Sequence, residues 1–132
     1  MRVAERLSAQ QETPITSFDS TEALVASGIA DAAIIASRTI DHRRDTQVMV
    51  EAGMRVLLEK PLGDTLDEAR QLAVWLEEDE TRSRAVMLAF QRRYDAAMLR
   101  AHELLREGII GELFKIVSIL EDPEPPPVGY QS

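Results

Sequence analysis

Short apolar runs alternate with segments of helical periodicity along the middle of the chain. The runs are Ala32–Ala36, Val56–Leu58 and Ala85–Phe90. Each is short and continuously apolar, which is typical of a strand buried on both faces. The segments between them, at 41–52 and 65–80, place apolar residues three or four positions apart and so predict helices. The pattern predicts an α/β fold with a doubly wound parallel sheet, at least over the part that carries the three runs.

Local signals suggest where further elements begin and end. Asp19 followed by Glu22 resembles the start of a helix that ends near Gly28, and Thr65 with Glu68 has the form of a capping box. The other predicted elements are a helix over 2–11, a brief strand at 15–18, a helix over 95–107, a strand at 114–120 and an extended proline-rich tail from 122.

Charge and composition exclude several classes of function. The 15 Lys and Arg residues against 23 Asp and Glu residues give a net charge of −8, which argues against nucleic acid or an anionic membrane surface as a partner. The sequence holds no cysteine and no spacing of His, Asp and Glu typical of a metal site. No apolar run reaches the length of a membrane span, and the first residues lack the apolar block of a signal peptide. We therefore expect a cytoplasmic protein.

Polar residues follow each predicted strand, at the edge of a parallel sheet where ligands bind. The residues concerned are Ser37, Arg38, Thr39 and His42 after the first run, Glu59, Lys60 and Pro61 after the second, and Gln91, Arg92, Arg93 and Tyr94 after the third. Hydroxyl, amide and cationic groups thus gather at one edge of an otherwise acidic chain. Such an edge suits an anionic or polyhydroxylated ligand.

Several of these segments resemble the Gfo/Idh/MocA oxidoreductase family, which includes glucose–fructose oxidoreductase and inositol dehydrogenases. The resemblance rests on Asp31–Ser37, on Ala52–Gly53 with Glu59–Leu62, and on Phe90–Asp95. Ile110–Leu113 and the tail ending in Tyr130 also resemble the family's entry into its second domain. The motifs stand in family order and cover essentially the whole chain.

The resemblance implies a fold, a chemistry and a set of site residues. It makes 1–93 the C-terminal part of a dinucleotide-binding Rossmann domain and 94–132 a linker helix with the first strand of an α/β substrate domain. It implies hydride transfer between a sugar, inositol or related polyol and NAD or NADP. Lys60 is then the catalytic residue, and a cis Lys60–Pro61 bond would aim it into the cleft. The residues implied for the cofactor are Ser37, Arg38, Thr39, His42, Glu59, Lys60 and Pro61, with Arg93 and Tyr94 on the substrate side.

The chain also departs from the family pattern. None of its glycines form the G-x-G-x-x-G turn that cradles the pyrophosphate, and Arg38 stands where many members carry proline. The family's second strand and its substrate-domain Asp and His are not matched either. These departures predict a fragment truncated at both ends, inactive or nearly so alone, whose strand near 31–37 is an open edge.

Other interpretations of the same residues stay open. The chain could be a non-catalytic interaction or assembly module, with its open strand and the 114–120 segment covered by a partner or in a homo-oligomer. It could also be a weak nucleotide or anion binder. Lys60 could be a solvated lysine paired with Glu59, and His42 a surface or capping histidine. Arg92 and Arg93 could pair with acidic residues such as Asp95.

Overall fold

The computed structural model describes residues 15–119. The chain divides into two compact units, the first ending at Gln91 and the second beginning at Arg92. The predicted helix at 2–11 and the proline-rich tail lie outside the described residues. The assignment of 1–93 and 94–132 to two domains stays a prediction.

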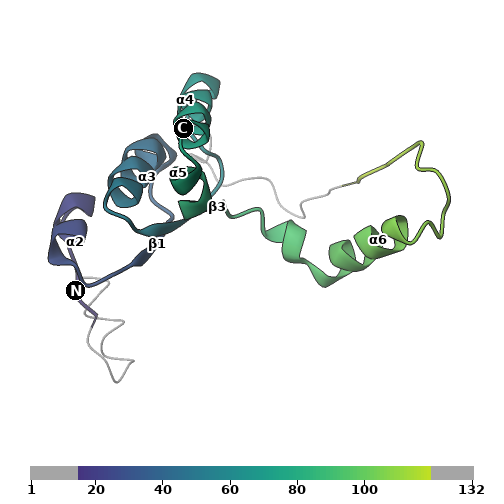
Figure 1. Ribbon diagram of the computed structural model, residues 1–132, viewed down its shortest axis with the longest axis horizontal. Coiled ribbons are helices and arrows are strands. Elements are labelled where there is room, and N and C mark those ends of the chain that lie inside the picture. The colour runs from purple at the N-terminus through teal and green to yellow at the C-terminus, as the bar shows by residue number, and fades with distance from the viewer. Residues whose placement is uncertain (1–14, 120–132) are drawn as a thin grey trace, which may run out of the picture. The chain divides into compact units, whose positions relative to one another are not determined.

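The first unit is built on a three-stranded parallel sheet (Figure 1). Its strands are β1 (Ala32–Ile35), β2 (Arg55–Leu58) and β3 (Val86–Leu88), in the order β1-β2-β3. Both pairs are parallel, which confirms the predicted strand–helix–strand arrangement. β3 is shorter than its apolar run at both ends, since Ala85 is the last residue of a helix and Ala89 and Phe90 have no strand assignment.

Neighbouring strands are in register, so each face of the sheet carries rows of side chains. Ile35, Leu58 and Leu88 form one row on the core face, where Leu58 is fully buried. Helix α3 (His42–Glu51) packs on β1 and β2 at this face, and helix α5 (Glu80–Ala85) contacts β3. The core cluster contains Ile35, Met49, Val50, Met54, Val56, Leu58 and Leu72.

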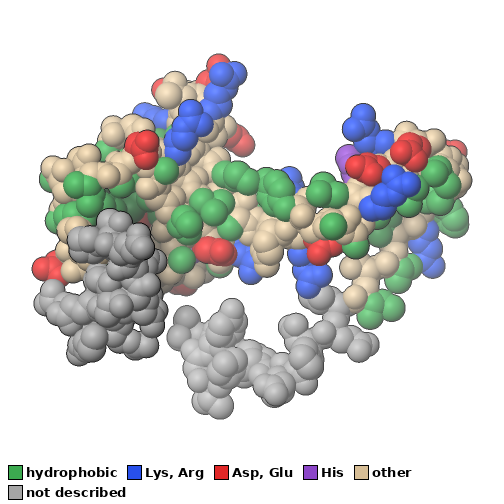
Figure 2. Space-filling view, turned by 90° about the horizontal axis from the view of Figure 1, so that it is seen from below, with side chains coloured by type: hydrophobic (Ala, Val, Ile, Leu, Met, Phe, Trp, Pro, Cys, Tyr) green, Lys and Arg blue, Asp and Glu red, His purple; other side chains and the backbone are tan. Residues whose placement is uncertain are grey.

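The opposite face of the sheet carries the row Ile34, Leu57 and Met87. Ile34 is 71% exposed and Met87 is 46% exposed, although both belong to apolar runs that the sequence predicted to be buried on both sides. In the part of the chain that the structure describes, burial is thus concentrated on one face. Hydrophobic side chains are accordingly visible among the charged ones on the surface (Figure 2).

Caps fix the helix ends, with one correction to the prediction. Helix α2 (Thr21–Ser27) begins after Ser20, whose Oγ accepts a hydrogen bond from the Ala23 amide, so the N-cap is not Asp19. The extended backbone of Ser20 puts its hydroxyl within reach of that amide, one residue later than predicted. Gly28 closes the helix at a φ of 63°, a left-handed conformation that glycine adopts without strain.

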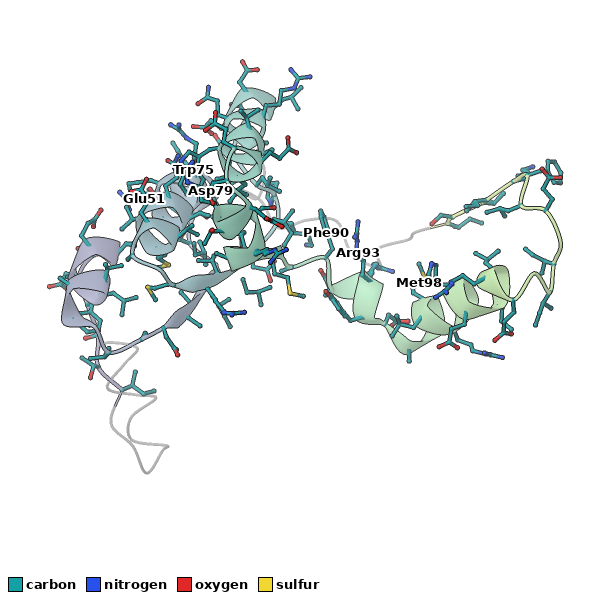
Figure 3. The ribbon with its side chains drawn as sticks, in the orientation of Figure 1. Glu51, Trp75, Asp79, Phe90, Arg93 and Met98 are labelled. Carbon is teal, nitrogen blue, oxygen red and sulfur yellow. The ribbon has the colours of Figure 1, made fainter. Side chains whose placement is uncertain are left out.

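The helix predicted over 65–80 is confirmed, although it ends earlier, and a second short helix that the sequence did not predict follows it. Helix α4 (Leu66–Glu77) starts at Thr65, whose Oγ1 accepts from the Glu68 amide as the capping box predicts. Asp79 then caps α5 by accepting from the amides of Thr81 and Arg82. The Arg82 guanidinium lies 4.6 Å from the centroid of the Trp75 ring and so links α5 to α4. Figure 3 labels Trp75 of α4 and Asp79, the cap of α5.

Two predicted strands do not form. Residues 15–18 and the described part of the other segment, 114–119, have no strand assignment. A strand needs a neighbour for its backbone hydrogen bonds, and neither segment pairs with one within the described residues. A short turn of 3₁₀ helix at Gln91–Tyr94 leads from the first unit into the second. Helix α6 (Ala96–Arg106) follows in the second unit; Asp95 caps it, and it confirms the predicted helix at 95–107.

We expect Leu58→Ala to lower the free energy of unfolding by about 2–5 kcal/mol, because it removes buried methyl groups and leaves a cavity in the core. Ile34→Ala is the matched control, since it removes apolar atoms from an exposed side chain of the neighbouring strand and should cost less than about 1 kcal/mol. Urea denaturation measures both values. Equal losses in the two variants would contradict the one-sided core.

Candidate functional site

The loops after β1 and β2 meet at the carboxyl edge of the sheet. Ser37 and Arg38 follow β1, and a 3₁₀ turn at Thr39–Asp41 leads directly into α3. The amide of Glu59, just after β2, still donates to the carbonyl of Ile35 at 2.9 Å, so the two chains leave the sheet side by side. The fold thus brings together the residues predicted after the first two apolar runs.

His42 is the residue that links these two loops. Its side chain is almost fully buried, with 2% exposure. Nδ1 lies 2.8 Å from the carbonyl oxygen of Pro61, and Nε2 lies 3.2 Å from the carbonyl oxygen of Ser37. The alternative of a surface histidine is therefore wrong. The predicted contact with a cofactor stays a prediction, and both ring nitrogens lie within hydrogen-bonding distance of backbone carbonyl oxygens.

Lys60 projects from the loop after β2 and is exposed. The Glu59 carboxylate accepts from the backbone amide of Lys60 at 3.3 Å. Within residues 15–119, no ion pair involves the Lys60 ammonium, so the alternative of a Lys60–Glu59 pair is not what the structure contains. The Lys60–Pro61 peptide bond is cis, as the resemblance implied.

The other predicted site residues after β1 are partly engaged with neighbours. The Arg38 guanidinium pairs with Asp41, with Nη2 at 3.0 Å and Nε at 3.1 Å from Oδ2. Thr39 is half-buried at the start of the 3₁₀ turn. The Ser37 hydroxyl donates to Asp45 Oδ2 at 3.1 Å. Of the two cations in the loops after β1 and β2, Arg38 has a carboxylate partner and Lys60 has none among the described residues.

Asp45 is a buried carboxylate of α3 that binds the loop after β1, and the sequence analysis did not identify it. Its Oδ1 accepts from the Thr21 hydroxyl at 3.0 Å and from Arg44, whose Nη2 lies at 2.8 Å. Burial by itself raises the pKa of the Asp45 carboxyl. The hydrogen bonds from Arg44, Thr21 and Ser37 outweigh that effect, so its pKa lies below the ordinary value of 3.8. The available signal was its position on α3, one turn after His42.

The substrate-side residues Arg93 and Tyr94 belong to the 3₁₀ turn at Gln91–Tyr94, which crosses into the second unit. Both are exposed, and Figure 3 labels Arg93. Their role beside a substrate stays a prediction.

Within the described ranges, no cluster of three or more His, Asp or Glu side chains could hold a metal ion.

A hollow of about 390 Å³ lies at the other end of the strands. Gly53 and Ala85, which stand before β2 and β3, line it together with Asp79, Thr81 and Arg82. Two of its charged groups are already engaged, since Asp79 caps α5 and Arg82 contacts Trp75, and Glu51 lines it as well. The carboxyl edge therefore remains the better candidate for a site.

The family model that matches this chain describes an oxidoreductase family with an NAD-binding Rossmann fold, and it matches residues 2–88. The chain belongs to the Gfo/Idh/MocA family. The family is NAD-binding, and its Rossmann fold agrees with the parallel sheet and helices found here.

Individual relatives of this Gfo/Idh/MocA chain are inositol dehydrogenases. The chain is 29% identical over 109 residues to inositol 2-dehydrogenase of Rhizobium meliloti, covering 83% of this chain and 32% of the relative. It is 31% identical over 125 residues to a myo-inositol dehydrogenase of Streptomyces leeuwenhoekii, covering 95% and 37%. The chain therefore spans about a third of the length of these relatives.

A solved relative carries ligands. The scyllo-inositol dehydrogenase of Lactobacillus casei, solved with bound NAD(H) and scyllo-inositol, superposes with a TM-score of 0.70 at 25% identity. The match covers 84% of this chain and 32% of that one.

Within residues 15–119, every helix is too short or too polar to cross a membrane.

We expect Asp45→Asn to destabilise the chain by about 1–3 kcal/mol at neutral pH, because Thr21, Ser37 and Arg44 lose a charged acceptor that is itself buried. The folded pKa of Asp45 is lowered, so its stabilising effect is present above the unfolded pKa and is lost as the pH falls through the folded pKa. The difference between parent and variant should therefore be constant near neutrality and shrink below about pH 4.

Urea denaturation at a series of pH values measures this difference. Asp31→Asn is the control, since Asp31 is exposed and the change should lower stability at neutral pH far less than Asp45→Asn does. A parent–variant difference for Asp45→Asn that stays constant down to the acid limit would contradict the role of the buried carboxylate.

Proposed function

We propose that this chain is the central part of an NAD(P)-dependent oxidoreductase that acts on a sugar, inositol or related polyol, with Lys60 as its proton-transfer residue. The observation that carries the proposal is Lys60 itself. It is an exposed lysine at the carboxyl end of the middle strand, with no carboxylate partner among the described residues, in a chain related to inositol dehydrogenases.

The residues of this edge suit the nicotinamide end of a dinucleotide. Lys60 offers an amine that no ion pair in the described region engages, and the contacts of His42 with the Ser37 and Pro61 carbonyls hold the loops after β1 and β2 together beside it. Lys60, Glu59 and Thr39 would border the bound group. When bound, the nicotinamide ring supplies the acceptor or donor of a hydride.

The chemistry assigned to Lys60 is a proton transfer at a substrate hydroxyl. Oxidation of an alcohol removes the proton of the O–H group and a hydride from the carbon that bears it, and leaves a carbonyl. The neutral Lys60 amine accepts the hydroxyl proton at Nζ, becomes an ammonium and returns the proton to solvent. Reduction runs in the opposite sense, with the ammonium as the acid.

The family's Gly-rich phosphate-binding turn is not among the residues of this chain. The sequence contains no G-x-G-x-x-G, so it lacks the backbone amides that hold the pyrophosphate in Rossmann domains. We therefore infer that the 132-residue chain carries part of the site and turns over slowly or not at all by itself.

Protection of Lys60 from acylation tests cofactor binding without requiring turnover. The chain has two lysines, Lys60 and Lys115, so Lys115 serves as an internal control in the same sample. We expect NADH at about ten times its Kd to reduce labelling of Lys60 by acetic anhydride roughly tenfold and to leave Lys115 unchanged. Peptide mass spectrometry measures both sites.

Two variants make this labelling test sharper. Lys60→Ala and Lys115→Ala each remove one positive charge, and only the first should weaken NADH binding. ADP-ribose, which lacks the nicotinamide, should protect Lys60 less than NADH does. Equal protection of both lysines, or protection of neither, would contradict the assignment of Lys60 to the cofactor site.

We expect no NAD⁺- or NADP⁺-dependent oxidation of myo-inositol, scyllo-inositol or common sugars above the blank when the 132-residue chain is assayed for reduced nicotinamide absorbance. The physical reason is the missing pyrophosphate cradle. Robust turnover that disappears in Lys60→Ala would contradict the inferred inactivity while supporting the role of Lys60.

A non-catalytic assembly module is the second candidate. It is favoured by the exposed row that contains Ile34 and by β1, which has one hydrogen-bonded neighbour in the described sheet. A stable dimer in light scattering, together with unchanged Lys60 labelling in NADH, would select this candidate over the oxidoreductase.

A further inference from the structure

The buried side chain of His42 contacts backbone groups of two loops, an arrangement that suits a structural role. It is the first residue of α3, its side chain is 2% exposed, and its two ring nitrogens face carbonyl oxygens from two different loops. One carbonyl belongs to Ser37, after β1, and the other to Pro61, after β2. The ring therefore spans the two loops that carry most of the predicted site residues.

The chemistry of the two contacts shows which one holds more strongly. A carbonyl oxygen only accepts hydrogen bonds, and a neutral imidazole carries one N–H. The Nδ1 contact to Pro61 is the shorter, at 2.8 Å against 3.2 Å for the Nε2 contact to Ser37, so a neutral ring places its proton best on Nδ1. The carbonyl of Pro61 is then held directly by α3.

The Ser37 loop is fixed at a second point by Asp45, one helical turn after His42. Asp45 accepts from the Ser37 hydroxyl at 3.1 Å and from Thr21 of α2 at 3.0 Å. We call the set Thr21, Ser37, His42, Asp45 and Pro61 the loop bracket. It runs from α2 through α3 to the residue that follows Lys60, and His42 and Asp45 within it are buried.

We propose that His42 is a positioning residue for Lys60: by holding the Pro61 carbonyl against α3, it fixes the backbone next to Lys60 relative to the Ser37 loop. The proposal replaces the predicted direct contact between His42 and a cofactor. It rests on the proposed function for the role of Lys60, whereas the bracket itself can be tested without any ligand. A fixed lysine matters because proton transfer depends on short, aligned contacts.

Three substitutions of His42 test the contacts of its two ring nitrogens separately. In His42→Asn the side-chain amide lies near the place of Nδ1 and can still donate to Pro61. In His42→Gln it lies near the place of Nε2 and reaches the Ser37 carbonyl instead. His42→Leu fills a similar volume and donates to neither. If Pro61 is the contact that positions Lys60, Asn should rescue and Gln and Leu should not.

The first readout needs no cofactor. Growth with ¹⁵N-lysine gives backbone amide signals from Lys60 and Lys115 alone. We expect the heteronuclear NOE and the chemical shift of Lys60 to stay near the parent values in His42→Asn, and the NOE to fall in His42→Gln and His42→Leu. The Lys115 signal should not move in any variant. Should His42→Leu fail to fold, the comparison of Asn with Gln still decides the outcome.

The second readout is NADH affinity in a double-mutant cycle. We expect His42→Leu to weaken NADH binding roughly tenfold when Lys60 is present and by less than about twofold in the Lys60→Ala background. Equal losses in both backgrounds would mean that His42 acts directly on the ligand and would overturn the proposal. An unchanged Lys60 amide signal in His42→Gln and His42→Leu would overturn it as well.

The two readouts separate this proposal from the proposed function. If the parent chain binds no NADH but Lys60 loses its NOE in His42→Leu and keeps it in His42→Asn, the oxidoreductase assignment fails and the positioning role of His42 stands. If NADH binds to the parent chain but the Lys60 amide signal is unaffected in every His42 variant, the oxidoreductase assignment stands and the positioning role of His42 fails.

Discussion

The hydrogen-bonded ladder around β2 is the constraint on which the first unit depends. As the middle strand, β2 pairs in parallel with β1 on one side and β3 on the other. Pairing on both sides satisfies its backbone groups and buries Leu58 completely. Because the strands are parallel, the loop after β1 and the loop after β2 emerge at the same edge. The position of Lys60 follows directly from this arrangement.

Beyond the ends of the strands, a buried network of polar side chains holds the loops in place. Of the three polar side chains of α3 that are buried, His42 and Asp45 are matched by hydrogen-bonding groups from three other segments. Buried polar groups are costly unless they are paired, so such a network specifies one arrangement of the loops rather than adding general stability. Apolar packing against the core face of the sheet provides the stability of the fold, and the polar network fixes the position of the loops after β1 and β2.

The sheet is covered unevenly within the described residues. Helices pack on the face that contains Ile35 and Leu58, whereas Ile34 and Met87 on the other face remain substantially exposed. Doubly wound sheets are ordinarily covered on both faces. The family match to about a third of each longer relative is consistent with that uneven coverage. The exposed row therefore bears on the choice between the two candidate functions.

The sequence by itself determined the local elements and their order. Continuous apolar runs identified the three strands, and helical periodicity with Thr65 and Gly28 identified the helices, because these signals depend on neighbours in the chain. The same reasoning failed at 15–18 and 114–119, where an alternating pattern has no partner strand in the described structure. Strand formation is a pairing between distant segments, which a local pattern does not contain.

Only the tertiary structure decided what the polar residues of the site do. The resemblance assigned Ser37, His42 and Lys60 alike to the cofactor site, and position in the sequence does not separate them. In the fold, Ser37 and His42 turn to internal partners, Asp45 joins them from the interior, and Lys60 stays exposed. The reason is physical: burial and hydrogen-bond partners are set by which segments of the folded chain meet, and Thr21 and Pro61 reach their partners on α3 from 24 and 19 residues away in the sequence.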